Sequence, residues 1–150
     1  MLKKNKISKL FFYSGISVLT MLLFFSCSKN TGSSSDDGDH IPVDVNDVTY
    51  PVITIDKPLS NQVFVSGDTI KIQGLVTDNS LYRGNIKIIN DVNGLALLDQ
   101  DYEIHGLPSY NFSRLYKTAV TTTSNYTVSV EFEDHGLNVT TKTVKVKVNP

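Results

Sequence analysis

From Pro51 onward, apolar and polar residues alternate in short runs, and turn residues close each run. Because successive side chains of a strand point to opposite faces, such runs predict β-strands that bury one face. Val, Ile, Thr and Tyr dominate the runs, and none has the apolar spacing of a helix. The predicted strands cover residues 52–55, 61–65 leading into 66–80, 85–90, 95–104, 109–116, 125–134 and 139–148.

The alternation also predicts which side chains point into a core. In the run over residues 66–80, the even-numbered residues from Ile70 to Val76 share one face, and Lys71 and Gln73 occupy the other. A side chain that alternates with lysine in this way is expected to be buried. The same argument places two further sets inward, namely Tyr126, Val128, Val130 and Phe132, and Val144, Val146 and Val148.

Two local features refine this pattern. Val139 has the opposite parity from Val144 within the last run, which predicts a β-bulge between them that lets both ends face the core. Asn93 and Gly94 separate two runs, and both residue types tolerate positive φ. This pair therefore predicts a tight hairpin.

The number and spacing of the strands predict the fold class. About seven short strands, each followed by a turn, are typical of an Ig-like antiparallel β-sandwich. We therefore expect residues 50–150 to form one all-β domain of this class. The chain has a single cysteine, so no internal disulfide can form and the apolar core must hold the sandwich.

The first 26 residues have a different pattern. Four lysines precede residue 10, and an apolar run follows over residues 10–25. This run is shorter than the ~20 residues that a membrane-spanning helix needs. A basic start, a short apolar run and small residues near its end are typical of a secretory signal peptide, so residues 1–26 are set apart from the fold.

The only cysteine, Cys27, directly follows this segment. The sequence Leu23-Phe24-Phe25-Ser26-Cys27, with small Ser26 before the cysteine, resembles the lipobox of bacterial lipoproteins, and its ending resembles that of Bacteroidota-type lipoproteins. The resemblance implies cleavage before Cys27, attachment of diacylglycerol and acyl chains to it, and an anchor in the outer membrane. The alternative, a thiol buried in a core, is disfavoured because no apolar residue follows until Ile41.

Residues 27–49 form the predicted tether between anchor and domain, since they are mostly small, polar and acidic. In Bacteroidota-type lipoproteins, acidic residues soon after the cysteine direct surface export. Asp36, Asp37 and Asp39 come only after Ser28-Lys29-Asn30, so surface display is favoured while the periplasmic face stays open. Without the four lysines of the signal peptide, ten basic residues remain against 15 acidic ones, which argues against nucleic-acid binding.

The domain itself also resembles a known group. Gly67-Asp68-Thr69 at a strand start, Asp78 at a strand end and a glycine-containing turn before the last strand are similar to the bacterial Ig-like domains of Bacteroidota lipoproteins, several of which are families of unknown function. This resemblance covers most of residues 50–150 and implies a fold, not a reaction. Asp68-Thr69-Ile70 also resembles a short O-glycosylation motif of that bacterial group, with Thr69 as acceptor, although a plain strand start explains it equally.

Catalytic chemistry is not indicated. The three histidines are His40, in the tether, and His105 and His135, at predicted turns or strand ends, and no sequence motif for a hydrolase, metalloprotease or phosphate-binding loop occurs. We expect no enzyme, no cofactor and no zinc site.

Calcium is the metal that the sequence favours most. In an Ig-like sandwich, the start of the first strand, the turn after the second and the turn before the last share one end. That would gather oxygen ligands from Asp47, Asp78, Asn79 and Asp134, as Ca²⁺ prefers. The alternative is that these residues only stabilise their own turns.

A binding surface for a protein or a glycan is the remaining candidate. The chain has no tryptophan, so tyrosine and arginine would have to supply its anchors, unless these rings fill the core. We expect a non-enzymatic, lipid-anchored adhesion or scaffold module whose partner is another envelope protein or a surface ligand; the alternative is a small-ligand module for calcium or glycan. The candidate surface residues are Tyr82, Arg83, Tyr102, Tyr110 and Tyr116.

Overall fold

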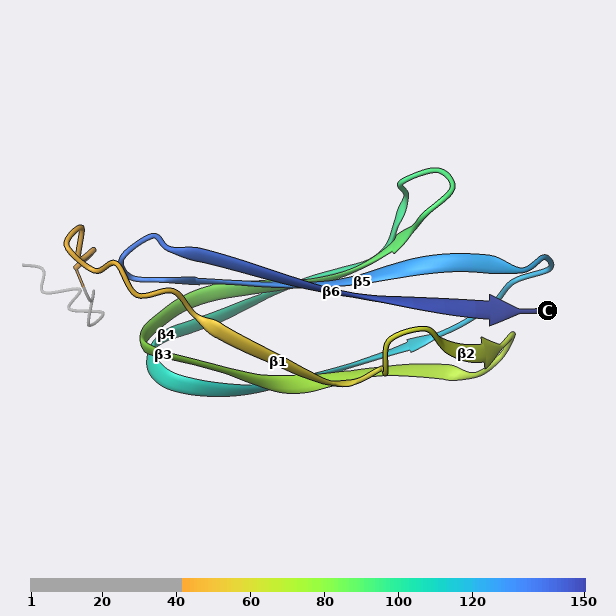
Figure 1. The fold of residues 1–150 in the computed structure, drawn as a ribbon, viewed down its shortest axis with the longest axis horizontal. Coiled ribbons are helices and arrows are strands. Elements are labelled where there is room, and N and C mark those ends of the chain that lie inside the picture. The colour runs from red at the N-terminus through yellow and green to blue at the C-terminus, as the bar shows by residue number, and fades with distance from the viewer. Residues whose placement is uncertain (1–41) are drawn as a thin grey trace, which may run out of the picture. The chain divides into compact units, whose positions relative to one another are not determined.

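The structure, a computed structural model, describes residues 42–150, which lie within one compact unit. The signal peptide, Cys27 and the tether up to residue 41 lie outside the described residues. Residues 42–150 contain no helix that could cross a membrane. They form six strands, β1 (Val52–Lys57), β2 (Gln62–Val65), β3 (Thr69–Asn90), β4 (Ala96–Lys117), β5 (Ser124–Asp134) and β6 (Val139–Asn149) (Figure 1).

The strands pair into two layers because β3 and β4 each cross from one layer to the other. The first half of β3 pairs with β1 and with the second half of β4, as in Val76 opposite Tyr110. These three segments are called the small sheet. The second half of β3 pairs with β5 and with the first half of β4, while β6 pairs with β5 and, in parallel, with β2. These five segments are called the large sheet, and the two together form the expected Ig-like sandwich.

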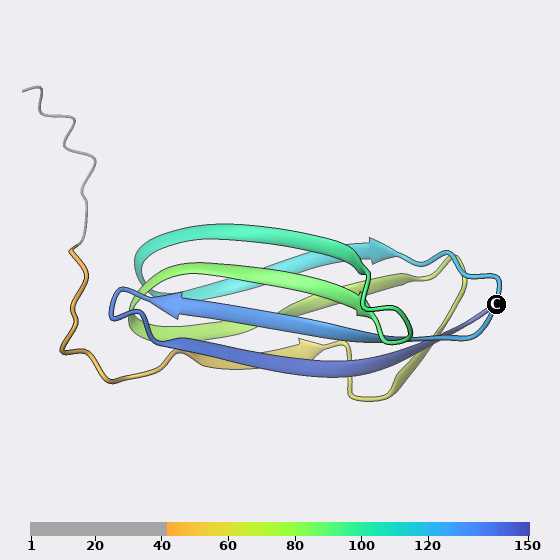
Figure 2. The same cartoon turned by 90° about the horizontal axis from the view of Figure 1, so that it is seen from above.

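The crossings occur where the long strands bend. The pairing of β3 is irregular between Thr77 and Leu81. β4 bends at Gly106, whose φ of +71° is a conformation that glycine adopts more easily than other residues. The sequence pattern predicts each half as a separate strand with a turn between. Both strands instead continue through the bend. The two bends lie at the end of the sandwich nearest the tether, as both views show (Figures 1 and 2).

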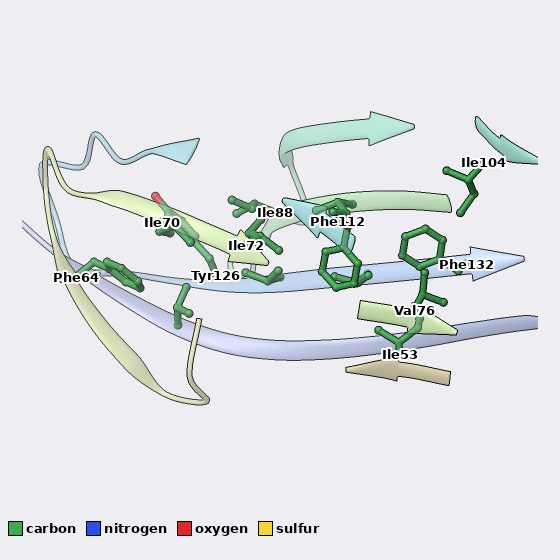
Figure 3. Packing of buried hydrophobic residues seen from close by; sticks show 14 of the residues in the cluster. Ile53, Phe64, Ile70, Ile72, Val76, Ile88, Ile104, Phe112, Tyr126 and Phe132 are labelled. Carbon is green, nitrogen blue, oxygen red and sulfur yellow. The ribbon is translucent and has the colours of Figure 1, made fainter. Parts of the chain in front are cut away.

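The core lies between the sheets and matches the predicted parity. Ile70, Val128 and Val130 are fully buried, and the rings of Phe112 and Phe132 lie 5.6 Å apart at its centre (Figure 3). The glycine at position 84 also belongs to this packing, since a Cβ there would lie 2.2 Å from the Phe132 ring. The even-numbered inward residues of β3, β5 and the C-terminal half of β6 are confirmed as core.

Two local predictions are wrong. β6 pairs with β5 without a shift from Val139 to Val148, so no bulge forms and Val139 stays exposed. Lys142, which has the same parity as Val144, is exposed and donates from Nζ to the Ile53 carbonyl at 3.0 Å. The connection between the end of β3 at Asn90 and the start of β4 at Ala96 is also longer than a two-residue hairpin turn. Gly94 has positive φ but Asn93 does not, so the pair does not form the predicted tight turn.

Candidate functional site

The end of the sandwich nearest the tether gathers three segments that are far apart in the sequence (Figures 1 and 2). The Asp44 amide donates to the His135 carbonyl at 3.0 Å, and the His135 amide donates to the Ser80 carbonyl at 2.9 Å. The Asn138 amide group donates to the Asp47 carbonyl at 3.1 Å. The last residues of the predicted tether are therefore bound to the β5–β6 turn and to the bend of β3.

Three of the predicted calcium ligands meet here. Asp47, Asp78 and Asp134 each offer a carboxylate oxygen, and these oxygens lie within 4.8 Å of one another. Asp134 is fully buried, while Asp47 and Asp78 are half-buried. We call these three residues the carboxylate trio. Asn79, the fourth predicted ligand, is exposed and lines a hollow of about 380 Å³ beside Asp47.

The β5–β6 turn holds the buried member of the trio in place. Asn138 donates its main-chain N–H to Asp134 Oδ1 at 2.9 Å and its side-chain Nδ2 to Asp134 Oδ2 at 3.0 Å. A Cβ at Gly136 would lie 2.8 Å from the Asp47 Cβ and 3.1 Å from Asp134 Oδ1. A glycine is therefore required where the turn passes between the two carboxylates.

The charges of the trio repel one another. Burial raises the pKa of Asp78, the Ser80 amide opposes this, and the nearby Asp134 and Asp47 carboxylates raise it further. The hydroxyl and amide of Thr49 lower the pKa of Asp47. Within residues 42–150, no lysine or arginine forms an ion pair with the three carboxylates. A hard divalent cation is the species that such an oxygen cluster accommodates chemically.

The two histidines of the domain lie beside the trio but outside it. The ring centroids of His105 and His135 are 5.5 Å apart, and Tyr82 contacts both, at 4.7 Å and 4.9 Å. His105 Nε2 also lies 3.2 Å from Glu103. The two histidines and Tyr82 therefore form an aromatic cluster.

A second polar region covers the outer face of the large sheet, where a hollow of about 360 Å³ lies over β3, β4 and β5. Arg83 Nε donates to Glu133 at 2.7 Å, and the guanidinium lies 5.2 Å from the Tyr82 ring centroid. Asn85 donates to Asp99 at 2.7 Å and to Asp101 at 2.6 Å. Arginine and asparagine thus tie the acidic side chains of this face together.

The predicted surface residues lie in three different places. Tyr82 and Arg83 stack together at the tether end of the large sheet. Tyr102 and Tyr110 are half-buried, lie 5.8 Å apart and pack against the core, and burial raises the pKa of Tyr102. Tyr116 also packs against the core, opposite Ile70. The five side chains do not form one shared platform.

Thr69, the predicted glycosylation acceptor, is exposed at the first position of β3. Its neighbour Asp68 accepts a hydrogen bond from the Val65 amide at 2.8 Å, and the Asp68 carbonyl accepts one from the Thr118 amide at 2.8 Å. Asp68 therefore has a structural role in the turn that precedes Thr69.

Sequence reasoning missed two parts of these sites. Asn138 holds Asp134 and Asp47 together, but an asparagine in a turn gives no signal of such a role. The second part is a row of acidic residues on β4, at Asp99, Asp101 and Glu103. Their alternate spacing in the sequence was a usable signal, because it puts all three on one face of a strand.

No protein-family model matches the chain, and no curated protein matches it. Among solved structures, it is similar to an engineered protein (14% identity, TM-score 0.47) over 67% of this chain and 20% of that one. It is also similar to fibronectin(III)-like modules of Clostridium thermocellum CbhA (20% identity, TM-score 0.43, 68% of this chain and 48% of that one). A third similar structure is murine CRIg (12% identity, TM-score 0.40, 67% of this chain and 98% of that one). The chain thus spans less than half of the first two structures.

Proposed function

We propose that the chain is a non-enzymatic lipoprotein of the outer membrane whose Ig-like sandwich binds another protein of the envelope or the cell surface, as an adhesion or scaffold module. Acyl chains on Cys27 anchor it, and the tether carries the domain away from the bilayer. We place the domain on the cell surface, with the periplasmic side as the alternative.

The observation that carries the interaction role is the outer face of the large sheet. There the Arg83 side chain is more than half exposed, stacks on Tyr82 and borders a charged hollow. Arginine and tyrosine are enriched among the residues that dominate protein interfaces, and tyrosine loses little conformational freedom on binding. A stacked arginine is also held in one orientation, which lowers the cost of binding further.

Affinity capture from a detergent-solubilised envelope tests this role. The full-length protein is expected to retain a partner that the Arg83→Glu variant loses. Lys71→Glu is the matched control, because Lys71 is exposed on the outer face of the small sheet. A partner that both variants retain equally would place the interface elsewhere, and a wild type that retains none would remove the proposed function.

The anchor has a separate test. A Cys27→Ala variant should accumulate as an uncleaved precursor that incorporates no labelled palmitate, whereas Ser28→Ala should be processed normally. Normal processing and membrane fractionation of Cys27→Ala would contradict the lipoprotein assignment.

A second candidate function, calcium binding, is favoured by the convergence of the carboxylate trio within 4.8 Å. An ion held by Asp47, Asp78 and Asp134 would join the end of the tether to the bend of β3 and to the β5–β6 turn. It would also offset the burial of the Asp78 charge and its repulsion by the other two carboxylates, which together raise the pKa of Asp78. Asn79, next to Asp78, is available at the rim.

Calorimetry and thermal unfolding with Ca²⁺, and with Mg²⁺ as the comparison, test this candidate. A site that binds only the folded state should gain about 2.7 kcal/mol of stability at a free Ca²⁺ concentration 100 times the Kd. Asp78→Asn should abolish this gain, and Asp56→Asn, which neutralises an exposed aspartate on β1, should leave it unchanged. No heat of binding and no shift of Tm in the wild type would eliminate calcium.

A further inference from the structure

We propose that the free edge of β4, along residues 96–105, binds an extended basic segment of a protein partner as an added strand. This inference rests on the proposed interaction function and specifies its site. It follows from three properties of β4, namely its pairing, its charge and the hollow beside it.

The first property is the pairing. β4 is 22 residues long, and among residues 42–150 its strand partner is β3 alone, so its other edge is open to a further strand. Within the large sheet the pairing with β3 is continuous from Leu98 to Glu103. Gly106 and Pro108 then interrupt the edge at the bend. Main-chain groups of an open edge can pair with an extended peptide, as in β-strand addition.

The second property is the charge along this edge. Asp99, Asp101 and Glu103 are exposed and project from the same face at alternate positions. A strand added next to β4 would place its own alternate side chains beside them, where opposite charges stabilise and like charges destabilise. The edge therefore fits a segment that carries Lys or Arg at every second position.

The third property is the hollow on the outer face. Asp101 and Glu103 line it together with Glu131 and Glu133, so its four carboxylates outnumber its two cations, Arg83 and Lys87. A long basic side chain from an added strand could extend over this surface. Because Arg83 and Lys87 already neutralise part of this negative charge, they limit the number of basic side chains that the face can bind.

Two other occupants are disfavoured by the same charges. If a second copy of the chain paired antiparallel through this edge about Asp101, each Asp99 would face a Glu103, which is repulsive. The tether after Cys27 carries Asp36, Asp37 and Asp39 against Lys29, so it has the wrong charge as well. A basic partner segment remains.

The test uses the full chain in detergent and three synthetic ten-residue peptides. The probe alternates lysine and threonine, the second peptide replaces lysine by glutamate, and the third is the lysine peptide N-methylated at four successive residues. N-methylation keeps the charge but removes the main-chain donors that strand addition needs. Fluorescence anisotropy measures affinity, and hydrogen exchange with mass spectrometry locates the protected amides.

The lysine peptide should bind and protect residues 96–105 but not residues 109–117, because this continuation of the same edge has no acidic residue and carries Arg114 and Lys117. The other two peptides should bind at least about tenfold more weakly. The triple variant Asp99→Asn, Asp101→Asn, Glu103→Gln should weaken the lysine peptide by about tenfold. Removing the three tether charges, by Asp36→Asn, Asp37→Asn and Asp39→Asn, should not.

Several results would overturn the inference. Equal binding of the N-methylated peptide would mean that charge alone acts, and protection at another edge would misplace the site. Concentration-dependent protection of residues 96–105 without peptide would assign the edge to a second copy. Capture of a partner that depends on Arg83 but not on the β4 charges would reject this inference while the proposed function stands.

Discussion

Two groups of three carboxylates differ in how the fold presents them. The carboxylate trio of Asp47, Asp78 and Asp134 comes from three distant segments, and one member is fully buried. The acidic row of β4 comes from one strand at alternate positions, and all three members are exposed. In the trio the oxygens lie within 4.8 Å of one another, whereas the row spreads its charge along an edge.

The difference shows that arrangement, not charge count, decides which ligand each group suits. Carboxylates that converge on one point in a partly buried place repel one another strongly and match a small hard cation. Carboxylates spaced along a strand are solvated, repel weakly and match another strand of opposite charge. An asparagine side chain donates a hydrogen bond to a carboxylate in each group, from Asn138 in the trio and from Asn85 in the row.

The largest expected effect comes from Asn138→Ala. It removes the Nδ2 donor from the buried Asp134 carboxylate and from the Asp47 carbonyl. Loss of a hydrogen bond to a buried charged group should lower the free energy of unfolding by about 2–3 kcal/mol, measured by urea denaturation. An effect no larger than that of Asn85→Ala would contradict the distinction between the two groups.

The next effect concerns pH and the charge of Asp78. Its pKa is raised above the ordinary value of 3.8, so the folded state binds this proton more tightly than the unfolded state. Stability should therefore fall as pH rises from the ordinary value through the raised one. Asp78→Asn should be at least as stable as the wild type at pH 7 without calcium, and its advantage should disappear in acid. Thermal unfolding from pH 3 to 7 measures this, and a constant difference would argue against a raised pKa of Asp78.

A smaller effect is expected from Arg83→Ala. The ion pair with Glu133 is short, at 2.7 Å, but the arginine side chain is more than half exposed. Exposed ion pairs contribute about 0–1 kcal/mol, so stability should change by less than about 1 kcal/mol, and less still in 1 M salt. Partner capture should nevertheless be lost. A large loss of stability would mean that Arg83 acts in folding and would undermine its use as a binding probe.

The smallest effect is expected from Asn85→Ala. The side chain donates to both Asp99 and Asp101, yet these acceptors are exposed and water replaces the lost donor. Stability should change by about 0.5 kcal/mol or less, while binding of the lysine peptide should be kept or slightly improved because the two carboxylates become free. Urea denaturation and anisotropy on the same sample check both parts.

Some features of the sites were predictable and others were not. Asp47, Asp78 and Asp134 could be placed together from the sequence because the connectivity of an Ig-like sandwich fixes which turns share an end. The partition of Tyr82, Tyr102, Tyr110 and Tyr116 into separate places could not, since a half-buried tyrosine has the same alternation whether it faces the core or solvent. The bulge predicted near Val139 is wrong, since β6 keeps an unbroken register with β5 and leaves Val139 exposed.

The sequence by itself determined which segments are extended, the inward faces from Ile70 to Val76 and from Tyr126 to Phe132, and the all-β class, because a period of two acts locally along the chain. It also carries the lipobox-like segment at Cys27, which lies outside the described structure. The tertiary structure alone decided that β3 and β4 run through both sheets, that Asn138 holds the trio and that, within residues 42–150, one edge of β4 stays open. These are contacts between segments far apart in the sequence, and local alternation contains no information about which segments meet.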